Sequence, residues 1–132
     1  MSSGESVAVV TLWLDAADNG QIERLIELST PDIELIGPRG SGHGRELLRE
    51  WMQRAGLHLT TLRIFARDNA VVTEQHGVWR SLATGDITGE LDLAARFRVV
   101  ERRVGQFARY DNLDAALKEA GLGYSDEMVV LG

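Results

Sequence analysis

The chain has 132 residues, enough for one domain built around one hydrophobic core. It contains no cysteine, which excludes disulfides, zinc–thiolate sites, iron–sulfur clusters and a cysteine nucleophile. The 20 acidic and 14 basic residues give a formal net charge of −6, which argues against nucleic acid or a membrane as a partner.

We expect residues 1–132 to form a single domain, with its core within about residues 7–122 and a tail over residues 123–132. The longest apolar run, residues 7–14, is much shorter than the roughly twenty residues of a membrane span. No basic leader precedes it, so the sequence predicts a cytoplasmic protein.

The first part of the chain has the pattern of helices. Apolar residues recur every three or four positions over residues 4–17, which predicts a helix. A shorter helix is predicted over residues 22–26, and we expect Pro31 to end it. Residues 32–36 alternate between polar and apolar, which predicts a short strand.

A glycine-rich loop is predicted over residues 37–44, and it holds His43 between two glycines. The segment lacks the pattern of a nucleotide-binding loop. His43 is either an acid–base group or a solvated loop histidine. A third helix is predicted over residues 47–55, with Gly56 as its cap.

The second half of the chain has the pattern of strands joined by tight turns. The strands are predicted over residues 57–65, 71–80, 87–100 and 104–110, and a short helix over residues 113–120. Helices followed by an antiparallel meander indicate an α+β fold. We expect a curved antiparallel sheet packed on the N-terminal helices, forming a cone with an apolar interior.

Four segments carry a resemblance to a known family. They are VVTLW at 9–13, PDIELIGP at 31–38, GRELL at 44–48 and FARYD at 107–111. With this order of elements, the chain resembles the SnoaL-like proteins of the nuclear transport factor 2 and ketosteroid isomerase superfamily. The resemblance covers about residues 7–122 and implies their cone-shaped, cystatin-like fold. It leaves the reaction open, because this scaffold hosts isomerases, hydrolases, polyketide cyclases and association domains.

The resemblance also implies that two known mechanisms do not operate here. The positions matching the ketosteroid isomerase base and oxyanion hole are Ile36, Trp13 and Ala95. The positions matching the catalytic groups of limonene epoxide hydrolase are Gln75, Gly77 and Arg109. Neither set keeps the family's functional groups.

The same matches assign the two faces of the strands, and the pattern of residues 87–100 supports them independently. Predicted to face the cone are Thr73, Gln75, Gly77, Trp79, Leu91, Leu93, Ala95, Phe97, Val99, Phe107, Arg109 and Asp111. Predicted to face outward are Glu74, His76, Arg80, Asp92, Arg96 and Arg98, with Val72, Val78, Ala94 and Val100 as an apolar part. We expect this outer face to form a homodimer.

Arg109 and Asp111 are the candidate catalytic pair, because residues two apart on a strand share a face. The pair could anchor an anionic or carbonyl-bearing ligand or act on a bound water. The structural alternatives are Asp111 as the N-cap of the last helix and Arg109 as a partner of Glu34.

The candidate ligand-binding residues are those expected to line the cone: Trp13, Ile36, Gln75, Trp79, Phe97 and Phe107. The alternative for the tryptophans is core filling. A buried Gln75 needs a hydrogen-bond partner, which a ligand, a water or Arg109 could supply. The three histidines lack metal-ligand spacing, so we predict neither a metal nor a cofactor.

The sequence therefore favours binding of a small, largely apolar molecule in the cone, with the reaction unassigned. One alternative is an isomerase, polyketide cyclase or epoxide hydrolase with a relocated acid or base. The other is a non-catalytic dimerisation or association module.

Overall fold

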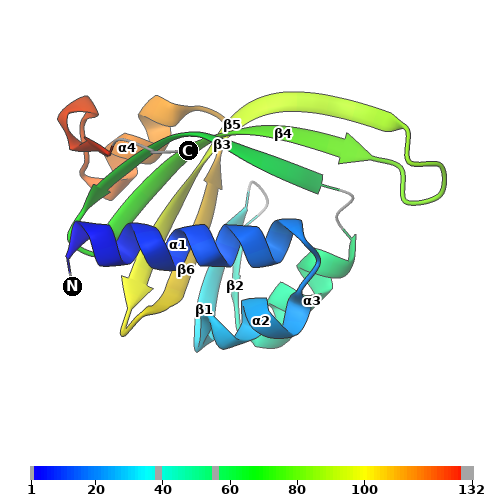
Figure 1. Cartoon of the computed structure of the whole chain (residues 1–132), viewed down its shortest axis with the longest axis horizontal. Coiled ribbons are helices and arrows are strands. Elements are labelled where there is room, and N and C mark those ends of the chain that lie inside the picture. Colours follow the sequence, from blue (N-terminus) through cyan, green and yellow to red (C-terminus); the bar gives the residue numbers. More distant parts are fainter. Residues whose placement is uncertain (1, 38–39, 55–56, 129–132) are drawn as a thin grey trace.

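A single curved sheet of seven strands carries helices on both of its faces (Figure 1). The structure, a computed structural model, describes residues 2–37, 40–54 and 57–128, with only the backbone for residues 52–54 and 57. The strand order is β2-β1-β6-β5-β4-β3-β7. Every neighbouring pair is antiparallel except β1 and β6, which are parallel. The predicted α+β architecture is confirmed, with this parallel pair as a difference from the expected antiparallel sheet.

The helices begin and end close to the predicted positions. Their bounds are Ser3–Asp18 for α1, Ile22–Glu27 for α2, Arg45–Arg54 for α3 and Leu113–Ala120 for α4, with a short 3₁₀ turn at Tyr124–Asp126. The side chain of Ser2 caps α1 by accepting a hydrogen bond from the backbone N–H of Glu5. Gly121 ends α4 with a φ of 72°, a conformation that favours glycine. The predicted end of the third helix at Ala55 and Gly56 lies outside the described residues.

The strands include two that the sequence pattern did not indicate. Their bounds are Ser29–Gly37 for β1, Gly40–His43 for β2, Leu57–Arg67 for β3, Ala70–Arg80 for β4, Ile87–Val100 for β5, Arg103–Tyr110 for β6 and Glu127–Met128 for β7. β2 replaces part of the expected glycine-rich loop and pairs with β1. β7 forms from the tail and pairs with β3, where Arg63 donates two hydrogen bonds to the carboxylate of Glu127, at 2.6 and 3.0 Å.

Pro31 does not end the second helix as predicted, because it lies inside β1. The register between β1 and β6 is interrupted between Ser29 and Glu34, and the pairing with β2 begins only at Glu34. Pro31 therefore lies where the sheet needs no N–H from the strand, which is the position a proline tolerates.

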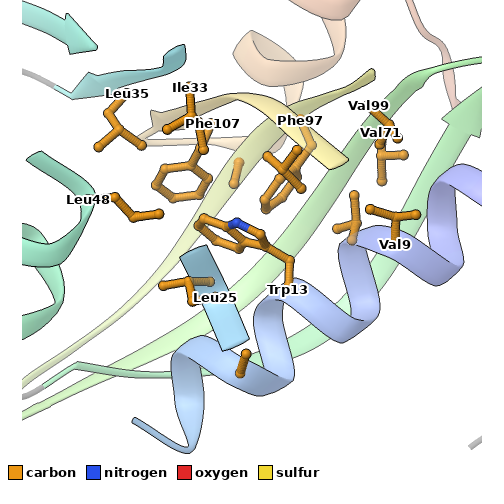
Figure 2. Packing of buried hydrophobic residues seen from close by; sticks show 14 of the residues in the cluster. Val9, Trp13, Leu25, Ile33, Leu35, Leu48, Val71, Phe97, Val99 and Phe107 are labelled. Atoms are coloured by element: carbon orange, nitrogen blue, oxygen red, sulfur yellow. The ribbon is translucent and has the colours of Figure 1, made fainter. Parts of the chain in front are cut away.

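The main hydrophobic core lies between the inner face of the sheet and helices α1, α2 and α3 (Figures 1 and 2). The predicted inner face is confirmed by the burial of Thr73, Gln75, Gly77, Leu93, Ala95, Phe97 and Val99. Leu91 differs, since 52% of it is exposed where the β4–β5 hairpin extends past the helices. The faces of β4 and β5 were thus assigned correctly from the family resemblance and the pattern of residues 87–100, and helix coverage decided which positions are buried.

The outer face of the sheet is partly covered by α4. Val72 and Ala94 are buried in a second cluster with Leu113, Ala116 and Leu117 of that helix. These two residues were expected to form the apolar part of a dimer surface, and the structure corrects this because α4 occupies the position. Among the described residues, no helix combines the length and the apolar character needed to cross a bilayer.

Candidate functional site

Three of the predicted ligand-binding residues form a closed aromatic cluster. Trp13 packs against Phe97 and Phe107 with ring centroids 5.5 and 5.2 Å apart (Figure 2). Its indole N–H donates to the hydroxyl of Ser29 at 2.9 Å, and this hydroxyl donates to the carbonyl of Leu25 at 2.7 Å. The packing and the satisfied N–H match the core-filling alternative for Trp13.

Ile36 lies on the opposite side of the sheet from this cluster. In the register of β1 and β6, Leu35 is opposite Phe107 and Ile36 is opposite Ala108. Since neighbouring residues on a strand point to opposite faces, Leu35 faces the core and Ile36 faces outward. The expectation that Ile36 lines the cone is therefore corrected by one position of strand register.

Gln75 and Thr73 place unpaired polar atoms in the apolar inner face. Both residues lie on β4 and are fully buried. The amide nitrogen of Gln75 lies 3.4 Å from the hydroxyl of Thr61, which is a long hydrogen bond. Among the described residues, nothing donates to the Gln75 carbonyl oxygen or pairs with the Thr73 hydroxyl. Rotating the amide of Gln75 by half a turn exchanges its two ends and still leaves one of them unpaired.

Trp79 and Arg109 meet at the exposed end of the inner face. Together with Leu91 they form what we call the rim. The guanidinium carbon of Arg109 lies 5.6 Å from the centre of the Trp79 ring, which is a cation–π contact. Arg109 lies opposite Ala95 and Trp79 lies opposite Gly89, so the side chain of Arg109 reaches this ring across β5 and along it toward the hairpin. The predicted placement of Arg109 and Trp79 on one face is thus confirmed.

Asp111 does not pair with Arg109. It is exposed just beyond the end of β6, and no ion pair joins it to Arg109 in the described part of the chain. It is not the N-cap of α4 either, since the side chain of Asn112 accepts from the N–H of Ala115 at 2.8 Å. Both residues of the predicted pair do line one small cavity, of about 210 Å³, whose other lining residues are Tyr110, Asn112 and Ala115.

Glu34 and His43 belong to the outer face rather than to the site. Glu34 accepts a hydrogen bond of 2.6 Å from the amide of Gln106, and its carboxylate lies 3.7 Å from His43. Glu34 is therefore not the partner of Arg109, and His43 is a strand residue of β2 instead of a loop histidine.

No charged residue of the described part of the chain is buried as a whole, although the Nε atoms of Arg45 and Arg96 are buried without a hydrogen-bond partner. The buried polar side chains of this part are Ser6, Ser29, Thr73, Gln75 and Gln106. No group of three histidine, aspartate or glutamate residues in this part is arranged to hold a metal ion. An acid or base acting in the cone would therefore have to come from a residue that is at least partly exposed, among those described.

The sequence interpretation gave no functional role to Thr61 or Thr73, the two threonines discussed above with Gln75. Thr73 was assigned to the inner face, and a hydroxyl on an otherwise apolar face could have marked it as a candidate site residue. Thr61 could not have been placed opposite Gln75, because the register of β3 and β4 shifts between Thr61 and Arg63. Such a bulge is not visible in the alternation of a single strand.

Comparison with known proteins gives a consistent picture of the fold. Residues 10–110 match the sequence profile of the SnoaL-like domain. No curated protein matches the chain. An NTF2-like protein of Burkholderia xenovorans is 22% identical in sequence, with 89% of this chain and 97% of that chain covered and a TM-score of 0.71.

Two further solved structures carry enzyme names. A candidate polyketide cyclase of Xanthomonas campestris is 19% identical, with 91% of this chain and 99% of that chain covered and a TM-score of 0.70. A candidate ketosteroid isomerase of Kribbella flavida is 15% identical, with 84% and 80% covered and a TM-score of 0.71. At these identities the similarity concerns the fold, and function must be argued from the site.

Proposed function

Because the chain belongs to the SnoaL-like family, we propose that it uses the family's cone to bind a small, largely apolar molecule. The ligand enters at the rim, its apolar body lies along the inner face of β4 and β5, and a polar group reaches Gln75. The aromatic cluster around Trp13 closes the opposite end of the cone and limits the length of the ligand.

The observation that carries this proposal is the unpaired amide end of Gln75. A buried polar atom without a partner costs about 1–3 kcal/mol, so natural cores rarely retain one without a reason. A leucine at this position of β4 would fill similar space at no such cost. A hydroxyl or carbonyl on a ligand would form the missing hydrogen bond with the amide. This bond would raise the affinity for the ligand and fix its orientation in the cone. The Thr73 hydroxyl, two residues away on the same face, offers a second polar contact.

The solved relatives suggest which compounds to test first. Two of them are named for polyketides and ketosteroids, which are largely apolar molecules with carbonyl or hydroxyl groups. These groups are what the amide of Gln75 can hydrogen-bond. We therefore take progesterone, emodin and farnesol as probes of a steroid, a polyketide-like aromatic and a terpenoid.

An enzyme that uses Arg109 and Asp111 is the second candidate function. It is favoured by the single cavity that both residues line. It requires chemistry in this cavity beside the start of α4, where the exposed carboxylate of Asp111 stays solvated. An Asp111→Asn variant that turns over a carbonyl or epoxide substrate at the wild-type rate would remove this assignment.

Binding is tested by calorimetric titration of each probe and by the melting temperature with and without it. We expect at least one probe to bind the wild type, and Gln75→Leu and Trp79→Ala to weaken its binding. Gln106→Leu is the matched control, because it removes a buried amide from the opposite face and should leave binding unchanged. The proposal is wrong if no probe binds, or if Gln75→Leu binds as tightly as the wild type.

A further inference from the structure

Arg109 is a cation held by an aromatic ring instead of by a carboxylate. Its contact among the described residues is the cation–π contact with Trp79, and it is half-buried. Within the part of the chain that the structure describes, neither of the two carboxylates considered in the sequence analysis, Asp111 and Glu34, forms an ion pair with Arg109. Asp111 is exposed and forms no ion pair with Arg109 among the described residues, and Glu34 accepts a hydrogen bond from Gln106 on the other face.

The contact with Trp79 leaves Arg109 in a conformation that can bind an anion. A guanidinium lying over a ring face keeps its N–H groups free along its edge, where they form a planar fork. This fork matches the two oxygens of a carboxylate, and the pair is stronger than a neutral hydrogen bond. The ring of Trp79 also restricts the side chain, so less conformational entropy is lost when the anion binds.

The position of Arg109 relates this anion to the apolar ligand. Arg109 lies opposite Ala95, and the fully buried Gln75 and Leu93 lie two residues from Ala95 toward the β4–β5 hairpin, on the same face between Arg109 and Trp79. An elongated molecule can place its apolar body against Leu93 while a charged end remains at the half-exposed rim. This arrangement spares the charge the cost of full burial.

We propose that the ligand is an organic monoacid whose carboxylate binds Arg109 at the rim. This inference rests on the proposed binding function and adds the chemical class of the ligand. A single guanidinium balances a single negative charge, and the exposed Asp111 is only two residues from Arg109 in the chain. A doubly charged phosphate would be repelled by that aspartate, so a carboxylate fits the local charge better.

The test compares two probes of nearly the same shape, naphthalene-2-carboxylate and naphthalene-2-carboxamide, by calorimetric titration of the full chain. We expect the wild type to bind the acid about tenfold more tightly than the amide, the size expected for a hydrogen bond to a charged group. Arg109→Gln should remove this preference, because it weakens binding of the acid more than binding of the neutral amide. Arg98→Gln is the matched control, because it removes an exposed arginine from the outer face of β5.

The salt dependence gives a second measurement that needs no variant. Raising the ionic strength should reduce the preference for the acid, because the rim is half-exposed and its charges are screened. Equal affinity for acid and amide in the wild type would overturn the inference while leaving the proposed binding function intact. A preference that persists in Arg109→Gln would also overturn it, and failure of both probes together with progesterone, emodin and farnesol would count against both proposals.

Discussion

Replacing Gln75 by leucine should raise the free energy of unfolding of the ligand-free protein and lower its affinity for the ligand. The substitution removes an amide whose carbonyl oxygen is fully buried and unpaired, and it keeps a side chain of similar size. Removing the unpaired atom recovers about 1–3 kcal/mol, and losing the 3.4 Å contact to Thr61 costs about 0.5–1.5 kcal/mol. Thr61 is only half-buried, so its hydroxyl is not stranded.

The balance is a gain of about 1 kcal/mol in the free energy of unfolding. In a chain of 132 residues this corresponds to a rise of about 3–4 °C in melting temperature. Urea denaturation followed by circular dichroism measures it, and an unchanged slope against urea shows that the same unfolding transition is compared.

Gln106→Leu provides the matched comparison, with the opposite sign. The amide of Gln106 donates to the carboxylate of Glu34 at 2.6 Å, so its removal should destabilise the protein by about 1 kcal/mol. If Gln75→Leu instead loses 1 kcal/mol or more, the amide is satisfied within the fold. The physical argument for a ligand at Gln75 would then fail, whatever the binding data show.

Three further predictions concern stability. Trp13→Phe should cost about 2–3 kcal/mol in urea denaturation, because it shrinks the central ring of the core and deletes the bond to Ser29. Asn112→Ala should cost about 1 kcal/mol through loss of the N-cap of α4. The pKa of His76 is raised above its ordinary 6.5, mainly by a hydrogen bond to the carboxylate of Asp92 and also by one to the carboxylate of Glu90. Stability from His76 is therefore complete below pH 6.5 and is lost as the pH rises through the raised pKa, so His76→Gln should lower the melting temperature only on the acid side.

Each of these predictions has its own control. Asp111→Ala should leave stability nearly unchanged, and a loss equal to that of Asn112→Ala would mean that Asp111 shares the capping role. For His76, a melting-temperature difference from His76→Gln that is constant between acid and alkaline pH would show that the histidine acts through packing instead of charge. A loss below about 0.5 kcal/mol in Trp13→Phe would indicate a loosely packed cluster.

Much of the architecture follows from local patterns in the chain. Alternation along residues 87–100 indicates which side chains of β5 face the helices, because the side-chain period of a strand is two, whereas the faces of β4 were assigned from the family resemblance. The start of α1 follows from Ser2 and the serine-x-x-glutamate spacing, since a cap acts over three residues. Such features depend on neighbours in sequence and are therefore readable from it.

Other features depend on pairings between distant segments. β7 exists because Met128 and Glu127 meet β3, and β2 exists because it meets β1. Pro31 is tolerated in β1 only because the register with β6 is interrupted there. None of these pairings leaves a trace in the local hydrophobic pattern.

The candidate site divides in the same way. The sequence, through its resemblance to the SnoaL-like family, placed Gln75, Trp79 and Arg109 on the inner face, because a match at one position fixes every second residue of a strand. Only the tertiary structure decided that Arg109 contacts Trp79, that Asp111 stays apart, and that Gln75 keeps one unpaired atom. The reason is physical: hydrogen bonds and stacks reach only a few ångströms, and which groups come that close is decided by long-range strand register and by the helices that cover the sheet.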